Sequence, residues 1–349
     1  MALQASGPIS FSQIANEFGT PSGKNLGAYR ISQSVAGLSN LPLDAGIPQS
    51  GTIRFSDFYN KRLNIVLDCG SGSRITARSR YNDNIGITVI GGFRGRPDSS
   101  AGRKVWIHTN SFINSNIPAI FAPNREYSSL ITGGWESNTD LRLDIGPGGF
   151  VTGSGGNGGG GGSDRCGGGG GGRFGTSAIG VNYQPIIITN RGRIQGGTGG
   201  GGGGGAAYGE NRRSSRRDVI CRAAGGGGGG GMGSPAGSGG GPGGGTGATR
   251  ANLRRFPTAG GSGDLFNQGG GGIGGLVTGA GTSAEGGSGG AGGNNGAGGG
   301  AGGESSCAGP GGGAGAPGFG IIITNNGSGV SITNNGTLLG GVAYNTGVS

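Results

Sequence analysis

The sequence has few of the residues that carry most enzymatic and metal chemistry. Its 349 residues include one histidine, His108, and four cysteines with no Cys-x-x-Cys pair. The spacing predicts neither a zinc site nor any other cofactor. Only 16 residues are acidic, so a pair such as Asp140 and Asp144 is weak support for a glycosidase. We therefore expect no enzymatic activity.

Apolar and aromatic residues are also scarce, at 31% and 6% of the chain. This composition excludes a conventional core along the whole length and leaves a modest one for the first 150 or so residues. No stretch approaches the ~18 apolar residues of a membrane helix, so we expect no membrane insertion. The N-terminus lacks a basic segment followed by an apolar one. We therefore predict a protein made in the cytoplasm and exported only if something else carries it.

Glycine is present in large excess, with 98 residues, against about 7% in an average protein. Its main runs are 158–162, 167–172, 199–205, 225–231 and the mixed Ala/Gly/Asn stretch 286–303. Segments of different composition separate these runs, at 176–185, 206–224, 248–258 and 264–268. The net charge of +10 indicates either an anionic partner or a means of keeping a glycine-rich chain soluble.

Residues 1–62 form a first module with an internal repeat. The segment Ser-Gly-Pro-Ile-Ser-Phe-Ser at 6–12 returns as Ser-Gly-Thr-Ile-Arg-Phe-Ser at 50–56. In each copy a serine after Ile-x-Phe can cap a short helix, predicted at 13–18, ending at Gly19, and at 57–61. Helices this short need a partner surface, so we predict an attachment module. The candidate attachment residues are Ile9, Phe11, Ile14, Phe18, Ile53, Phe55, Phe58 and Tyr59.

Residues 63–152 are predicted to form a small β-sheet domain. Runs rich in Ile, Val and Leu alternate with Gly, Asn, Asp or Pro, and the predicted strands are 64–68, 74–81, 85–90, 104–109, 118–122 and 141–145. Its core is expected to come from the aromatic residues Trp106, Trp135, Phe112, Phe121 and Phe150.

Residues 153–349 form the third predicted domain, which is rich in glycine and framed by strands. Ile-Ile-Ile-Thr-Asn at 186–190 returns at 321–325, and more loosely as Val-Ser-Ile-Thr-Asn at 330–334. Asn-x-Gly follows each copy, and these residues tolerate the positive φ of a turn. The unit is therefore a strand, a turn, a short strand and glycine.

The glycine runs themselves favour a folded block. Collagen is excluded because there is no strict Gly-X-Y period, and no Walker lysine supports a phosphate loop. A flexible tether would not need the Ile-rich strands that punctuate the runs. Extended glycine helices of the polyproline-II type can instead bond laterally to one another, since no side chain keeps them apart. The predicted fold is mostly β and irregular, with a polyglycine-II-like sandwich framed by short strands.

This arrangement resembles the distal long-tail-fibre adhesins of T-even-like phages. The Ile-Thr-Asn-x-Gly units resemble those of phage tail fibre and tail tip proteins. Residues 8–14 and 53–59 resemble a segment shared by structural proteins of tailed phages. The resemblance implies a virion protein, assembled in the host cytoplasm, that binds other tail fibre or baseplate proteins through its N-terminal part. It also implies that the loops between glycine runs bind a bacterial surface polysaccharide or outer-membrane protein.

Receptor specificity must come from these loops, because a glycine lattice has no side chains. Aromatic rings can stack on sugars, and arginines can bind phosphate or carboxylate. The candidates are Tyr183, Tyr208, Arg212, Arg213, Arg216, Arg217, Arg254, Arg255, Phe256 and Phe266. The alternatives to receptor binding are that the arginines form a solvated loop and that the aromatic residues anchor their own loops.

Three other functions remain open at this stage. A structural tail or baseplate joint explains the attachment module but not the variable inserts. The segment 212–217 resembles arginine-glycine RNA binders, but the framing strands argue against disorder, and we expect no nucleic-acid partner. A depolymerising tail spike would show a long β-helix with denser apolar strands. The cysteines are expected to be buried thiols, or to include a disulfide among Cys166, Cys221 and Cys307 outside the cell.

Overall fold

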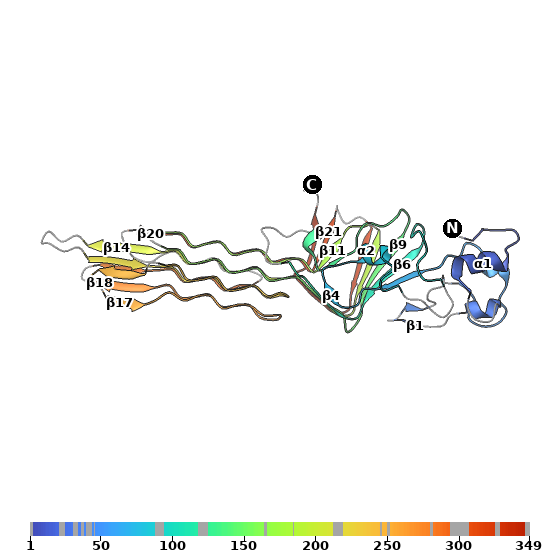
Figure 1. Cartoon of the computed structure of the whole chain (residues 1–349), viewed down its shortest axis with the longest axis horizontal. Helices are drawn as coiled ribbons and strands as arrows, with labels where there is room; N and C mark the ends of the chain where they lie inside the picture. The colour runs from blue at the N-terminus through green and yellow to red at the C-terminus, as the bar shows by residue number, and fades with distance from the viewer. Residues whose placement is uncertain are drawn as a thin grey trace.

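The computed structural model describes residues 3–20, 25–30, 34–35, 38–39, 44, 46–87, 94–117, 125–163, 166–183, 185–211, 219–244, 246–249, 252–279, 282–293, 307–324 and 329–345. The molecule is elongated (Figure 1): an N-terminal module lies at one end, a β-body in the middle, and extended glycine runs lead to two small sheets at the other end. The fold is mostly β and irregular, as predicted. Among the described residues no helix is both long and apolar enough to span a bilayer.

The N-terminal module begins with helix α1 (Phe11–Phe18). Its cap is Ser10, two residues before the serine expected: the Ser10 hydroxyl accepts from the Gln13 N–H at 3.2 Å, and the Gln13 side chain accepts from the Ser10 N–H at 2.7 Å. The helix ends at Gly19 as predicted, with φ +95°. The second copy forms the 3-10 helix η2 (Phe55–Phe58) in place of an α-helix at 57–61.

The module has its own apolar core. This core joins α1, η1 (Leu26–Tyr29) and η2, and its buried members are Leu3, Ile14, Phe18, Tyr29, Ile47, Phe58 and Leu63. A short hairpin, β1 (Ser34–Val35) and β2 (Leu38–Ser39), accompanies it. A buried ion pair between Glu17 and Arg103 connects the module to the next part of the chain, and the Leu63 N–H donates to the same carboxylate at 2.8 Å.

The β-body is a three-sided parallel β-helix of five turns. We number its sides in the order in which the chain visits them. Sheet 1 consists of β3 (Ile65–Asp68), β6 (Lys104–Thr109), β9 (Asp140–Ile145), β12 (Ile186–Asn190) and β22 (Val330–Asn334). Sheet 2 consists of β4 (Gly72–Ser73), β7 (Phe112–Asn114), β10 (Phe150–Thr152), β13 (Arg193–Gln195) and β23 (Thr337–Leu339). Sheet 3 consists of β5 (Ile75–Thr76), β8 (Leu130–Ile131), β11 (Ile179–Val181), β21 (Ile321–Thr324) and β24 (Val342–Asn345).

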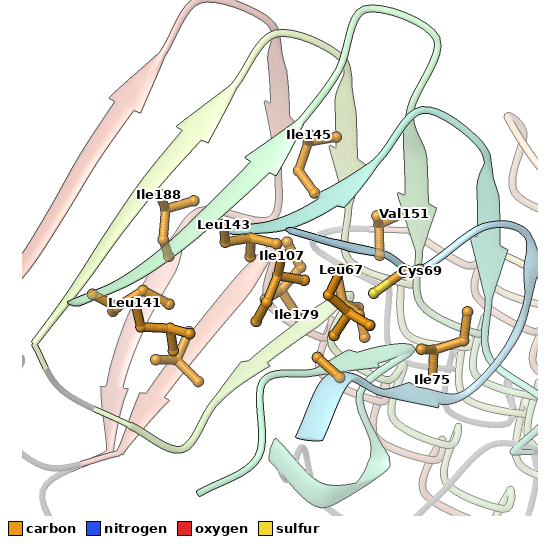
Figure 2. Close-up of a cluster of buried hydrophobic side chains, with 14 of the residues drawn as sticks. Leu67, Cys69, Ile75, Ile107, Leu141, Leu143, Ile145, Val151, Ile179 and Ile188 are labelled. Carbon is orange, nitrogen blue, oxygen red and sulfur yellow. The ribbon is translucent and has the colours of Figure 1, made fainter. Parts of the chain in front are cut away.

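Aliphatic ladders fill the inside of this β-helix. In sheet 1, for example, Leu67, Ile107, Leu143, Ile188 and Ile332 occupy the same position on successive turns. Figure 2 shows several of these side chains pointing into one cluster with residues of the other two sheets. Each fully buried Ile or Leu contributes about 1.5–3 kcal/mol, so stacked turns stabilise one another although each strand is short.

The aromatic residues contribute less to this core than predicted. Trp135 is buried, whereas Trp106 and Phe150 are half-buried and Phe112 is exposed. Phe121 lies outside the described residues. The reason is geometric: three short sheets that face one another at close distance are filled by stacked aliphatic side chains, so most large rings lie on the outer faces.

The strands at 64–68, 104–109 and 141–145 are confirmed to within one residue. The prediction of a strand at 74–81 was wrong, because only β5 is extended there and the chain continues as helix α2 (Ala77–Asn82). Residues 118–122 and 88–90 of two further predicted strands lie outside the described residues, and Ile87 makes an isolated bridge to Leu67. The 3-10 helix η3 (Arg125–Tyr127) precedes β8.

The Asn-x-Gly units at 190–192 and 334–336 form corners between sheets 1 and 2, as strand–turn–strand, and the unit at 325–327 lies outside the described residues. Sheet 1 aligns 186–190 with 330–334, the copy that looked more distant, whereas 321–324 belongs to sheet 3. Neither Gly192 nor Gly336 has positive φ. Glycine is needed there because a Cβ on Gly336 would lie 2.2 Å from the Gly192 carbonyl oxygen on the previous turn.

The glycine runs are two excursions from this β-helix. Both leave sheet 2 and return as a sheet 3 strand, over 153–178 and 196–320. The C-terminal strands β21–β24 thus share sheets with residues 65–152, so the expected boundary at 152/153 does not separate the β structure from the rest. The chain can depart and return at one corner because the flanking strands on both sides still pair with the neighbouring turns.

Neighbouring glycine runs bond laterally with a period of three residues. The N–H groups of Gly156, Gly159 and Gly162 donate to residues 198, 201 and 204, whereas those of residues 155, 158 and 161 donate to residues 235, 238 and 241. The same run accepts bonds from residues 225–231 and 170–176. One run therefore bonds to several neighbours around it, which is the pattern expected for extended chains with three residues per turn.

Close packing explains which positions must be glycine. A Cβ on Gly309, Gly312, Gly315 or Gly318 would lie 1.9–2.2 Å from a carbonyl oxygen of a neighbouring run. The six positions between them hold two prolines, two alanines and two glycines. A period of three, which the whole sequence does not show, is thus visible in this outer run. The inner run 225–231 meets backbone within 1.9–2.3 Å at every position and is entirely glycine.

Two small antiparallel sheets close the far end of the glycine runs (Figure 1). One consists of β16 (Gly247–Thr249), β15 (Val219–Ala223), β14 (Ala207–Asn211) and β20 (Cys307–Ala308). The other consists of β17 (Asn252–Arg255), β18 (Leu276–Gly279) and β19 (Thr282–Glu285). We call these two sheets the tip. Cys166 and Cys307 form a disulfide, one of the pairings anticipated, and Cys69 and Cys221 are buried thiols.

Candidate functional site

The tip is a thin sandwich whose interior is made of small residues. Ala207, Cys221, Ala223, Val277 and Ala284 form its buried cluster. Small side chains are required because the two sheets continue the close spacing of the glycine runs that lead into them. Among the larger side chains of the tip, those that are exposed, such as Arg254 and Phe256, are the groups available to a partner.

Arg254, Arg255 and Phe256 lie together at the edge of the tip, on and just after β17. The Arg254 guanidinium is exposed and donates to the Thr278 hydroxyl at 3.2 Å. Arg255 is half-buried, donates to the Gly274 carbonyl at 2.8 Å and pairs with Glu285 at 2.9 Å. Phe256 is 64% exposed. The structure thus places an apolar ring beside a cation that has no carboxylate partner among the described residues.

The remaining tip candidates differ in exposure. Tyr208, in β14, is buried, and its hydroxyl donates to Glu210 at 2.9 Å. This geometry favours a role inside its own sheet. Arg212, Arg213, Arg216 and Arg217 follow β14 in the sequence and lie outside the described residues.

Two candidates lie away from the tip. Tyr183 packs against the β-helix core, and its hydroxyl donates to the Glu136 carbonyl at 2.9 Å. Phe266 lies in a turn at the near end of the glycine runs, where its ring stacks on Phe150 of sheet 2 with a centroid separation of 6.1 Å. The sequence distance from Phe256 to Phe266 corresponds to one glycine run, so these two rings face different surroundings.

The turn that carries Phe266 faces sheet 2 residues that sequence reasoning did not assign to a site. Phe112, Phe150, Arg193 and Thr337 occupy equivalent positions on four consecutive turns. The Arg193 guanidinium lies 5.1 Å from the Phe150 ring centroid and 4.8 Å from that of Phe266. The sequence signal was the short strand after each turn, which begins with Phe, Phe, Arg or Thr before an aliphatic residue.

The attachment candidates separate into core and surface residues. Ile14, Phe18 and Phe58 are completely buried inside the module, and Ile9, Phe11 and Ile53 pack partly against them. The Tyr59 hydroxyl donates to the Gly7 carbonyl oxygen. Phe55 is 41% exposed. Of this set, Phe55 is therefore the side chain best placed to meet another protein.

The acidic residues considered for catalysis are engaged in structural bonds. Asp140 pairs with Arg142 at 3.0 Å, and Asp144 contacts His108 at 2.9 Å and Arg191 at 2.7 Å. Burial alone would raise the pKa of Asp144, but the hydrogen bonds and charges of His108 and Arg191 hold that pKa below its ordinary value. In the described part of the chain, no group of three His, Cys, Asp or Glu residues could hold a metal ion.

No protein-family model and no curated protein matches this chain. Among solved structures, the chain is similar to the crystal structure of the gp37-gp38 adhesin tip complex of the bacteriophage S16 long tail fiber. The similarity has 18% sequence identity and a TM-score of 0.35, and it covers 97% of this chain and 99% of that chain. At this identity and TM-score, the likeness does not establish a common fold.

Proposed function

We propose that this chain is a phage tail fibre adhesin that binds a receptor on the bacterial surface through its tip. The observation that carries the proposal is the laterally bonded glycine block, which holds two small sheets at the end of the molecule farthest from the N-terminal module (Figure 1). A tether would not need these bonds. A block that places a few arginines and one exposed aromatic ring at a distance from the rest is suited to presenting them to a surface.

The same architecture suggests how the adhesin is mounted on the virion. The N-terminal module has its own core and is joined to the β-helix through the buried Glu17–Arg103 pair. Forces applied at the tip would be transmitted through hydrogen-bonded structure to this module. We propose that its partners are other tail fibre or baseplate proteins, and that Phe55 contributes to that contact.

We also propose that the chain is not an enzyme. One argument against enzymatic activity, that a depolymerising tail spike would show a long β-helix, has become weaker. The structure contains a β-helix, a fold we associated with depolymerising tail spikes. It is short, however, and Asp140 and Asp144 lie four residues apart on β9, which corresponds to about 13 Å along a strand. Paired carboxylates of inverting glycosidases are at most about 9.5 Å apart. Incubation with polysaccharide from susceptible cells should release no oligosaccharides.

Binding of labelled protein to susceptible bacteria, in the absence of the virion, tests the proposal. We expect the wild-type chain to bind, and a chain with Arg254→Ala, Arg255→Ala and Phe256→Ala to bind at least about tenfold more weakly, as expected for an interface hot spot. Phe55→Ala is the matched control at the opposite end. It should bind cells normally and instead reduce incorporation into tail fibres.

Two results would contradict the proposal in different ways. If the wild-type chain does not bind susceptible cells, the chain is better explained as a structural joint of the tail. If the triple variant folds and binds like the wild type, the edge of the tip at β17 is not the receptor surface. A double variant with Arg254→Ala and Phe256→Ala keeps Arg255. It checks that loss of the Arg255–Glu285 ion pair is not the cause of weaker cell binding.

A further inference from the structure

A groove of about 400 Å³ lies on the flank of the β-helix, where sheet 1 turns into sheet 2. Its side chains come from two corners, three strands and the turn at the near end of the glycine runs: Pro147, Phe150, Arg191, Arg193, Phe266 and Thr337. None of them belongs to the tip. The groove is therefore separate from the surface proposed above to bind the receptor.

The floor of the groove is bare backbone. Gly148, Gly149, Gly192 and Gly336 line it from three stacked corners. A Cβ on Gly192 would lie 2.3 Å from the Gly149 carbonyl oxygen, so the corners stack too closely for any other residue. The floor thus offers peptide groups and no projecting side chains. Such a surface can contact a ring-shaped ligand closely.

Aromatic rings form one wall. Phe150 and Phe266 stack nearly parallel, at 14°, and Phe266 remains 54% exposed. The turn that carries Phe266 is held in place, because Asp264 accepts from the Phe266 and Asn267 N–H groups and the Gln195 side chain donates to the Leu265 carbonyl at 3.0 Å. An exposed ring on a fixed turn is a platform for the apolar face of a sugar.

The charge of the groove is positive and is not neutralised. Arg193 donates to the neutral Gln195 side chain at 2.7 and 3.1 Å, and no carboxylate pairs with it among the described residues. Its guanidinium is held over the Phe150 and Phe266 rings. Arg191, by contrast, is paired with Asp144. The Asp264 carboxylate is engaged by its own turn. An anion in the groove would therefore find one fixed cation beside an aromatic platform.

We propose that this groove binds an anionic saccharide of the bacterial surface, with a sugar ring against Phe266 and its carboxylate or phosphate on Arg193. The proposal rests on the adhesin function proposed above and adds a second binding site to it. An arginine fork matches carboxylate and phosphate oxygens, and the apolar face of a pyranose matches an aromatic ring. The combination favours a charged sugar over a neutral sugar or an isolated anion.

Titration of the full chain with small sugars tests the proposal directly. Binding of glucuronic acid, glucose 6-phosphate and glucose would be followed by saturation-transfer NMR and calorimetry. We expect the two anionic sugars to bind at least about tenfold more tightly than glucose, because a charged hydrogen bond is added. The stronger of the two identifies the anionic group preferred.

Variants assign each part of the recognition. Arg193→Gln should remove the preference for anionic sugars. Phe266→Ala should weaken all sugars, and Phe266→Tyr should restore binding. Tyr344→Ala removes an exposed aromatic ring on sheet 3, away from both proposed sites, and is the control that should leave sugar binding unchanged. Unchanged amide exchange in the run 153–162 shows that each variant keeps its fold.

Several results would overturn the proposal. These are equal binding of glucose and glucuronic acid, no binding of any sugar, an unaltered preference in Arg193→Gln, or inorganic phosphate binding as tightly as glucose 6-phosphate. Binding of an acidic peptide in preference to the sugars would assign the groove to a protein partner instead. If the groove fails, cell binding by the tip is unaffected, whereas failure of the adhesin function removes cell binding even if the groove binds sugars.

Discussion

Two adjacent glycines provide a direct test of the laterally bonded block. Gly159 is buried, and a Cβ placed on it would lie 2.0 Å from the Gly170 carbonyl oxygen. Gly160 is exposed, and its Cβ would meet only the Gly241 carbonyl oxygen, at 3.9 Å. The two substitutions to alanine are identical in chemistry and one residue apart, but only Gly159→Ala forces neighbouring runs to separate.

The two substitutions are expected to change the stability of the block in opposite directions. Moving residues 159–160 away from Gly170 breaks the 2.7 Å bond from the Gly170 N–H to the Gly160 carbonyl oxygen and weakens the 2.8 Å bond from the Gly159 N–H to the Gly201 carbonyl oxygen. Each lost bond costs about 1 kcal/mol, and overpacking adds about 1–3 kcal/mol, so Gly159→Ala should destabilise the block by about 3–5 kcal/mol. Gly160→Ala should stabilise it by about 0.4–1 kcal/mol, because alanine restricts the unfolded chain.

Amide hydrogen exchange, followed by mass spectrometry on peptides from the glycine runs, measures this difference. Tryptophan fluorescence would not, since Trp106 and Trp135 lie in the β-helix. The wild-type runs should be protected, and Gly159→Ala should lower their protection by at least about a hundredfold, as a loss of 3 kcal/mol or more implies. Rapid exchange throughout the wild-type runs, or equal effects of the two variants, would refute the reasoning.

Two further predictions concern stability elsewhere. Burial opposes ionisation of Glu136, but hydrogen bonds from Ser99, Ala101 and Ser100 lower its pKa to about 2 from 4.5. The stabilisation of the folded protein by the ionised carboxylate is therefore complete above pH 4.5 and is lost as the pH falls towards 2. Since 35% of the side chain is exposed, we expect Glu136→Gln to cost about 1–2 kcal/mol at pH 7 and almost nothing near pH 2, and a pH-independent difference in thermal unfolding would contradict this. The Cys166–Cys307 disulfide closes a separation of 141 residues and should contribute about 2–5 kcal/mol; reductant should speed exchange in the tip of the wild type and have no effect on Cys307→Ser.

Sequence patterns predicted the parts of the fold that depend on local residues. Short stretches of aliphatic residues and glycine were enough to predict the strands at 104–109 and 141–145, the helix end at Gly19 and the strand–turn–strand units. The β-helix was not predicted, because its turns are related in space and not in sequence. Connections of very different length separate the strands: residues 77–103, which include helix α2, lie between β5 and β6, and a glycine excursion of 26 residues, 153–178, separates β10 from β11.

The candidate site was predicted unevenly for a similar reason. Composition alone selected Arg254, Arg255 and Phe256 as candidates, and the structure places these consecutive residues at the tip. Phe266 has the same composition signal but lies one glycine run away, beside Phe150 and Arg193. Arg193 was not among the candidates, because its place in the proposed groove depends on its contacts with Gln195, Phe150 and Phe266, which only tertiary structure supplies. Tyr183 was chosen for its residue type, and its hydrogen bond to the Glu136 carbonyl explains it structurally.

Because the hydrogen bonds between glycine runs recur every three residues, the length of the block can change only in fixed steps. An insertion of three residues advances an extended run by one turn, about 9 Å, and restores the alignment of every donor with its acceptor. Insertions of one or two residues rotate the run and misalign all of its bonds. Lengths of neighbouring runs must therefore change together and by whole turns, so the distance between β-helix and tip is expected to vary among related chains in discrete steps.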